Sequence, residues 1–160
     1  MKKNFLCLFV LMVIIGYNFL YAQEVLVSDT LYKEITNETF LPLFKALKDG
    51  DVSTIKQYIS GDMYNKSKIL LEQNKDYPQF LRDFYHGARF WVKKIVKING
   101  DIIADVVIEF PNGDQGLVKL CLQKEMVNLQ GNNRREIWRV VKEVKDWYYF
   151  RPENTSTKIK

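Results

Sequence analysis

The spacing of the apolar residues changes once along this chain, near Ala88, and this change limits the folds that the chain can adopt. Before Ala88 the apolar residues recur every three to four positions, which is typical of helices. After Ala88 they alternate with polar residues, which is typical of strands with one buried face. Helices that all precede the strands predict an α+β fold, in which the helices pack against one face of an antiparallel sheet.

The first half predicts four helical segments, over about residues 36–49, 51–60, 62–74 and 77–87. Thr36 and Thr39 offer caps for the first segment, and Gly50 ends it. Asp51 or Ser53 then caps the second segment, because a short polar side chain can accept the free backbone N–H groups of a first helical turn. Residues 23–35 precede these helices and are expected to form an extended lead-in, either a short strand or an arm over the domain.

The second half predicts four strands that pair in chain order, as a curved antiparallel meander, with helices on its apolar face. Asn99–Gly100 is the residue pair that a two-residue hairpin turn prefers, and residues 111–114 form the second turn. A loop over residues 128–134 leads to the last strand. In the first strand, one face is expected to carry Phe90, Val92, Val96 and Ile98. Residues 36–150 form one domain in this interpretation, and residues 151–160 form a flexible tail.

Residues 1–22 have the layout of a secretory signal peptide. Lys2 and Lys3 precede an apolar run from Phe5 to Ile15, and the small residue Ala22 offers a cleavage site. The alternative is a membrane anchor, but the uninterrupted run is shorter than the roughly 20 residues that span a bilayer. We therefore expect an extracytoplasmic protein, periplasmic or secreted, that has no stable membrane span after cleavage.

Charge and cysteine content restrict the function classes. The net charge of +5 falls to +3 when Lys2 and Lys3 leave with the signal peptide, and this small excess does not favour nucleic-acid binding. Cys7 leaves as well, so Cys121 is the only cysteine of the mature chain and is expected to fill a strand interior. One His and one Cys at unrelated positions lack the spacing of metal ligands, so we expect neither a metal nor a cofactor.

Three segments resemble the nuclear transport factor two-like superfamily, also called cystatin-like. They are ALKDGDVSTIKQYIS at 46–60, YPQFLRDFYHG at 77–87 and IWRVVKEV at 137–144, in which Trp138 opens the final strand as in small secreted bacterial members. The resemblance covers roughly residues 36–146. It implies a cone-like domain in which a bent sheet wraps around helices to form a pocket. That scaffold carries isomerases, dehydratases, ligand binders, immunity proteins and assembly modules.

Aromatic residues supply the candidate binding positions. We select Tyr85, Trp91, Trp138, Trp147 and Tyr149 for a ligand or a partner, and no catalytic residue. Residues 146–150 (DWYYF) follow the last core strand, and strand alternation would turn about half of these side chains outward. The alternative for most of these aromatics is ordinary packing in the core or on the sheet.

Two function classes compete on this sequence. The first is an exported, non-catalytic binding or accessory protein, whose ligand or protein partner is unknown and which is compatible with a homodimer. The second is a small pocket enzyme, an isomerase or hydrolase that uses Tyr85, His86 or Asp105 as acid and base. His86 lies at the end of a predicted helix and Asp105 lies on the strand face opposite the apolar one. This arrangement favours the first class, because acid–base chemistry needs an oriented partner group.

Overall fold

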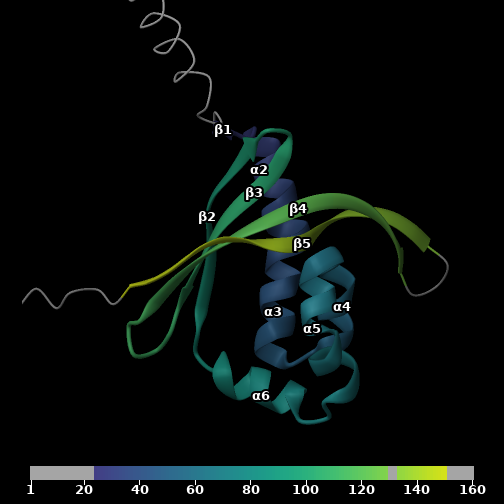
Figure 1. Cartoon of the computed structure of the whole chain (residues 1–160), viewed down its shortest axis with the longest axis vertical. Helices are drawn as coiled ribbons and strands as arrows, with labels where there is room; N and C mark the ends of the chain where they lie inside the picture. Colours follow the sequence, from purple (N-terminus) through teal and green to yellow (C-terminus); the bar gives the residue numbers. More distant parts are fainter. Residues whose placement is uncertain (1–23, 130–132, 151–160) are drawn as a thin grey trace, which may run out of the picture.

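The chain adopts an α+β fold, as the sequence predicts, in a computed structural model that describes residues 24–129 and 133–150 (Figure 1). The side chains of residues 129, 133 and 145–150 lie outside the described part. The predicted signal peptide at 1–22 and the predicted tail at 151–160 also lie outside it. Apart from a two-residue strand at Val25–Leu26, the described helices precede the strands along the chain and pack against an antiparallel sheet.

The helical half starts earlier than the sequence predicts. Helix α2 covers Asp29–Ile35, a π-helical turn η1 covers Thr36–Phe40, and α3 covers Leu41–Asp49. Together they form one long rod (Figure 1). The cap is Ser28, whose Oγ accepts a hydrogen bond of 3.3 Å from the backbone N–H of Leu31. The extended lead-in therefore ends at Ser28, whereas we expected it to continue to residue 35.

Pro42 explains why the rod contains a wider turn. A proline inside an α-helix lacks an N–H group, and its ring collides with the carbonyl four residues earlier. In the turn just before Pro42, the N–H of Leu41 donates to Thr36 O, five residues back. This wider turn lets the helix continue through the proline, so Thr36 lies within the rod and does not cap it.

Three further helices follow close to the predicted bounds: α4 at Val52–Tyr58, α5 at Gly61–Gln73 and α6 at Tyr77–Phe84. Gly50 ends α3 with a left-handed backbone (φ 65°), and a Cβ atom built there would lie 2.2 Å from the carbonyl oxygen of Pro78. Asp51 caps α4, because its carboxylate accepts a 3.1 Å hydrogen bond from the N–H of Thr54. The chain thus turns tightly between α3 and α4 while α6 packs against the turn.

In the part of the chain that the structure describes, the sheet has five strands, which pair antiparallel in chain order. They are β1 (Val25–Leu26), β2 (Arg89–Ile98), β3 (Asp101–Glu109), β4 (Gln115–Leu129) and β5 (Asn133–Phe150). The prediction of four strands is wrong by one, because the start of the lead-in pairs with the edge of β2, Val25 opposite Lys97. The predicted Asn99–Gly100 turn is confirmed: both residues have positive φ, 51° and 95°, as that hairpin turn requires.

A β-bulge in β2 changes the side-chain alternation that the sequence predicts. The register shifts between Val92 and Lys94, so one extra residue, Lys93, interrupts the ladder. Beyond the bulge, Ile95 joins Val92 in the core that faces the helices, and Val96 is buried on the opposite face. The expectation that Val96 and Ile98 share a face with Val92 is therefore wrong, because one inserted residue reverses the alternation.

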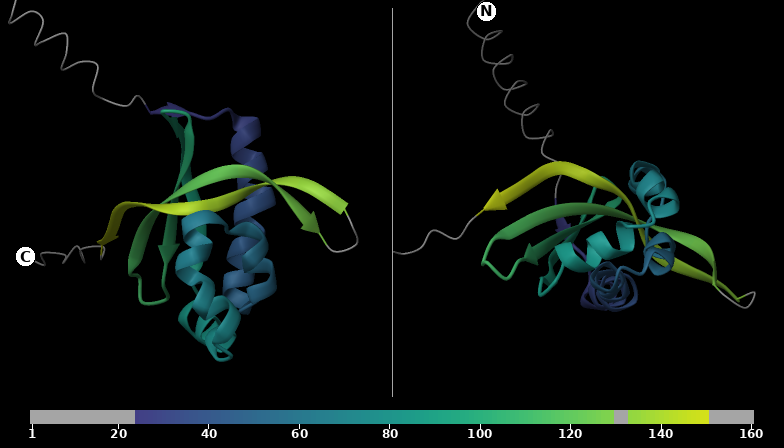
Figure 2. Two further views of the ribbon diagram at one scale, coloured as in Figure 1. Left: turned by 45° about the vertical axis from the view of Figure 1, so that its right-hand side comes forward. Right: turned by 90° about the horizontal axis from the view of Figure 1, so that it is seen from below.

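The last two strands are much longer than predicted. Beyond Leu122, β4 no longer pairs with β3, and residues 123–129 pair only with residues 133–139 of β5. This two-stranded segment, here called the β4–β5 ribbon, passes across the α2–α3 rod and beyond it (Figures 1 and 2). The loop predicted over residues 128–134 is wrong at both ends, because residues 128 and 129 pair with residues 134 and 133 as parts of β4 and β5.

The core lies between the helices and the facing side of the sheet. Phe40 and Ile35 are fully buried in the rod, and Leu81 is buried in α6. The facing strands contribute buried aliphatic side chains, namely Val92, Ile95, Ile102, Ala104, Val106, Leu120, Leu122 and Val140. Cys121 is fully buried within β4, as predicted, and burial raises the pKa of its thiol.

Candidate functional site

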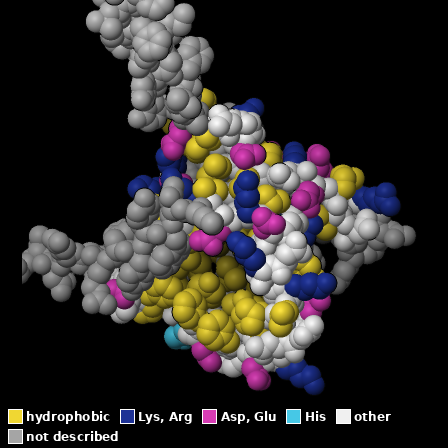
Figure 3. Space-filling model, in the orientation of Figure 1, with side chains coloured by type: hydrophobic (Ala, Val, Ile, Leu, Met, Phe, Trp, Pro, Cys, Tyr) yellow, Lys and Arg dark blue, Asp and Glu magenta, His cyan; other side chains and the backbone are white. Residues whose placement is uncertain are grey.

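A cavity of about 230 Å³ lies between the helices and the sheet, partly open to the surface. Helices α3, α4 and α5 supply one side, with residues such as Leu47, Ile55 and Leu71, and strands β2 to β5 supply the other, with residues such as Leu120 and Val140. In Figure 3, apolar side chains surround a hollow beside the end of the molecule where α6 lies. Cavities of about 150 Å³ with such a lining stay dry and take up apolar molecules.

Three side chains bring polar atoms to this cavity: Ser67 from α5, Tyr77 from the start of α6 and Tyr85 just after its end. Burial raises the pKa of both tyrosines above the ordinary value of 10.0. Their phenols therefore stay protonated at neutral pH and act as hydrogen-bond donors and acceptors. The described lining is otherwise apolar, which suits an uncharged ligand surface.

A chain of aromatic rings connects the cavity wall to the surface. Phe44 stacks on Phe90 with ring centroids 4.8 Å apart, and Phe90 lies 5.3 Å from Tyr85. Tyr85 meets Phe84 edge to face at 4.9 Å, and Phe84 stacks on Phe80 at 5.5 Å. Phe80 and Phe84 are half exposed, 54% and 50%, so this end of the molecule presents large apolar side chains to solvent.

The structure separates the predicted binding residues. Tyr85 lines the cavity. Trp91 is 38% exposed and pairs with Val107, whereas its neighbour Phe90 lines the cavity, so Trp91 lies on the opposite face of the sheet. Trp147 and Tyr149 belong to β5, but their side chains lie outside the described part of the chain.

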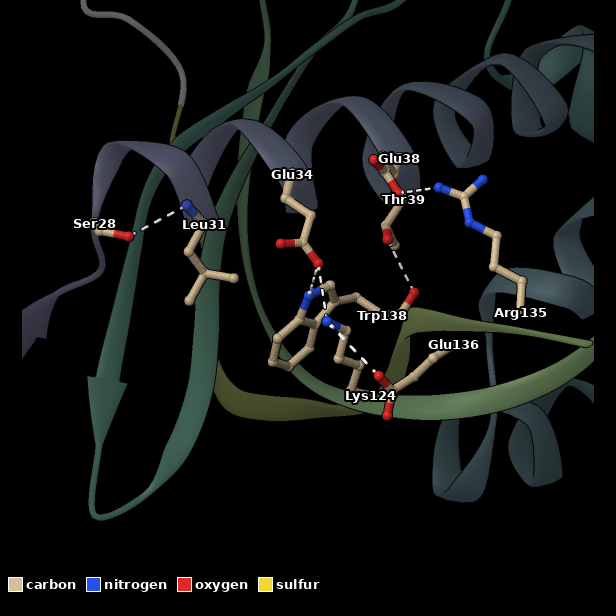
Figure 4. A network of polar contacts seen from close by, with 9 residues as sticks. All are labelled: Ser28, Leu31, Glu34, Glu38, Thr39, Lys124, Arg135, Glu136 and Trp138. Carbon is tan, nitrogen blue, oxygen red and sulfur yellow. Dashed lines mark hydrogen bonds and ion pairs between the residues drawn. The ribbon is translucent and has the colours of Figure 1, made fainter.

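Trp138 has a different role, since it fastens the β4–β5 ribbon to the α2–α3 rod (Figure 4). Its Nε1 donates a 3.0 Å hydrogen bond to Oε1 of Glu34 in α2. The ammonium group of Lys124 lies 3.2 Å from the same Glu34 oxygen and 5.6 Å from the centroid of the Trp138 ring. A cation, a carboxylate and an indole thus meet at one point, where their charges and dipoles are complementary.

Two contacts extend this attachment along the rod (Figure 4). The hydroxyl of Thr39, fully buried in η1, donates a 2.9 Å hydrogen bond to the carbonyl of Trp138. Arg135 forms an ion pair with Glu38. We call the whole set the polar clasp, and its members are Glu34, Glu38, Thr39, Lys124, Arg135 and Trp138.

Arg139 makes a second attachment on the same ribbon. Its guanidinium donates to Oε2 of Glu125 at 2.8 Å, to the carbonyl of Lys56 at 2.9 Å and to the carbonyl of Ile59. The hydroxyl of Ser60 donates to the other oxygen of Glu125 at 2.8 Å. The end of α4 is therefore held to β5 by charge-assisted hydrogen bonds.

The residues weighed for a pocket enzyme do not come together. Tyr85 lines the cavity, whereas His86 is exposed beyond the end of α6. Asp105 is buried on the sheet face opposite the cavity, where Lys94 lies 3.8 Å from its carboxylate. The same Lys94 contacts Glu24 of the lead-in at 2.6 Å. This ion-pair group attaches the N-terminal segment to the sheet.

Sequence reasoning missed most of the cavity lining. Ser67 and Tyr77 are predicted only as parts of helices, since the cavity forms from segments that meet only in the fold.

Within residues 24–129 and 133–150, no helix has the length and apolar character of a membrane span. Over the same ranges, no three His, Cys, Asp or Glu side chains gather as metal ligands would. Comparisons with protein-family models, curated proteins and solved structures return no match.

Proposed function

We propose that this chain is an exported, non-catalytic binding protein that holds a small apolar molecule in the cavity between its helices and its sheet. The observation that carries the proposal is the cavity itself. About 230 Å³ of space, partly open to the surface, lies between the helices and the sheet. Protein interiors rarely leave space of this size unfilled, and cavities of this composition favour apolar ligands over water.

The nuclear transport factor two-like, cone-like fold remains part of this proposal. Helices on one face of an antiparallel sheet support it, as do the register shifts of β2, β4 and β5, because such shifts bend strands. Export is supported by the pattern of residues 1–22. The intact mass of protein from the native host tests it: we expect a chain shortened by 22 residues, and a mass that retains Met1 to Ala22 would favour an anchor.

Ligand binding is tested with an uncharged fluorescent probe, N-phenyl-1-naphthylamine, and two cavity-filling variants of the purified protein. Val118→Phe fills the cavity from β4, and Ser67→Phe fills it from α5. We expect each variant to weaken probe binding at least tenfold. Val25→Phe is the matched control, since Val25 is exposed in β1, and it should bind like the original chain. Equal binding by all four folded proteins would exclude the cavity as the site.

A further inference from the structure

A second hollow shares one lining residue, Tyr77, with the cavity. This groove, of about 260 Å³, is lined by Leu70, Asn74, Asp76, Tyr77 and Phe80. Tyr77 also lines the cavity, so a single side chain forms a wall common to both spaces. The ring of Tyr77 stacks on Phe80 at 6.0 Å between centroids, with the planes 14° apart. An elongated molecule that passes Tyr77 would touch apolar side chains on both sides of it.

The groove is lined by both apolar and polar side chains. Leu70 and Phe80 are 41% and 54% exposed, which is costly for large apolar side chains unless something covers them. Among the polar lining residues, Asn74 accepts a 2.9 Å hydrogen bond from the backbone N–H of Asp76 through its Oδ1. The Asp76 carboxylate does not cap its own helix, and among the described residues it is the one charged side chain that lines the groove.

From the apolar lining of the cavity and the mixed lining of the groove, we infer that the site binds a single-chain amphiphile with an uncharged or cationic head. The hydrocarbon tail occupies the cavity, the chain passes Tyr77 and covers Leu70 and Phe80, and the head lies beside Asn74 and Asp76. A hydroxyl or amine head satisfies these acceptors, whereas a carboxylate head would meet the negative charge of Asp76. This inference rests on the proposed binding function and names its ligand class.

Chain length is the first test. Binding of straight-chain alcohols from six to twelve carbons is measured by displacement of the fluorescent probe, below the concentrations at which they aggregate. We expect affinity to rise about threefold per added carbon, because each buried methylene contributes favourably, until the groove is filled. If hexanol binds as tightly as decanol, the tail does not extend past Tyr77. The inference then fails while the proposed cavity function stands.

Two substitutions of exposed apolar residues test whether the ligand crosses the groove. Phe80→Ser removes an apolar wall of the groove, and Leu41→Ser is the control, because Leu41 is similarly exposed, at 53%, but lines neither space. We expect Phe80→Ser to weaken decanol binding about tenfold and to leave hexanol binding unchanged. Equal effects of both substitutions on decanol would overturn the inference. So would a concentration-dependent dimer that Phe80→Ser abolishes in sedimentation, because a second copy of the chain would then cover the groove.

The head group is tested by comparing decylamine, decanol and decanoate. We expect decanoate to bind at least threefold more weakly than decylamine, a modest effect because Asp76 is exposed and its charge is screened. Asp76→Asn should remove this difference, whereas Asp83→Asn, on the same helix but outside the groove, should preserve it. Tighter binding of decanoate than of decylamine by the original chain would contradict the assigned head group.

Discussion

The middle and the C-terminal part of the α2–α3 rod are held in place by different kinds of contact. Where the β4–β5 ribbon crosses the rod, the polar clasp and Arg139 make directional hydrogen bonds and ion pairs. Beside α3 and α6, the contacts are stacked aromatic rings and aliphatic side chains, and the cavity lies among them. Directional contacts allow one geometry, whereas apolar contacts tolerate small displacements. The proposed binding cavity thus lies in the region whose contacts can adjust to small displacements.

The largest expected loss of stability follows from a substitution at Gly50, in the apolar region. Gly50→Ala adds a Cβ atom 2.2 Å from the carbonyl of Pro78 and forces a side chain into a left-handed backbone, so α6 must move away from α3. We expect a loss of about 3 kcal/mol in the free energy of unfolding, measured with urea. Gly100→Ala is the control, because a Cβ there meets nothing within 4 Å. It should cost about 1 kcal/mol, and equal losses would mean that α6 does not press on Gly50.

An intermediate effect concerns the polar clasp. Trp138→Phe keeps an aromatic ring but removes the 3.0 Å hydrogen bond to Glu34. We expect a loss of about 1–2 kcal/mol in stability, since the donor to a charged group is removed, and unchanged affinity for the apolar probe. A double-mutant cycle with Glu34→Gln measures the coupling between the two side chains. If probe binding falls as much as stability does, the two regions are not independent.

The smallest effect is a pH dependence at the turn between α3 and α4. Hydrogen bonds from the side chains of Thr54 and Ser53, together with the Thr54 N–H, lower the pKa of Asp51 to about 2. Because this pKa is depressed in the folded state, the stabilisation is fully present above about pH 4 and is lost as the pH falls toward 2. Asp51→Asn keeps a capping group but removes the charge.

Urea unfolding at pH 6, 4 and 2.5 measures how much the Asp51 charge contributes to the free energy of unfolding. We expect Asp51→Asn to lose under 1 kcal/mol at pH 6, since Asp51 is exposed to solvent, and the gap to the original chain should narrow at pH 2.5. Asp29→Asn, at the first turn of α2, controls for a general change in charge. A gap that stays constant across the three pH values would show that the Asp51 charge does not contribute.

The sequence correctly predicted the features that depend only on residues adjacent in the sequence. The Asn99–Gly100 turn, the Asp51 cap and the stop at Gly50 follow from short segments, and each is where the sequence places it. The bulge at Lys93 could not be predicted in this way, because it depends on how β2 pairs with β3. The same holds for the β4–β5 ribbon, whose contacts with the rod join residues about 100 positions apart in the sequence, Trp138 with Glu34 and Arg135 with Glu38.

The residues of the candidate site also differ in whether local sequence could predict them. Tyr85 could be selected because it is an aromatic residue at the end of a predicted helix, and it does line the cavity. Ser67 and Tyr77 could not be selected, since neither the serine nor the tyrosine belongs to a motif, and the space between them exists only after α5, α6 and the sheet have packed. The sequence also favours Trp138 for a ligand or a partner, and its indole N–H donates a hydrogen bond to Glu34, which no local motif indicates.

The wide turn at residues 36–40 has a consequence for the rotation of the rod. Each residue of an α-helix advances the side-chain direction by about 100°, and a π-helical turn contains roughly one residue more than an α-helical one. The added residue turns everything after it relative to everything before it. Glu34 can therefore face the ribbon while Phe44 and Leu47 face the cavity. A single continuous helix thus serves two differently oriented neighbours, and the length of one turn sets the angle between them.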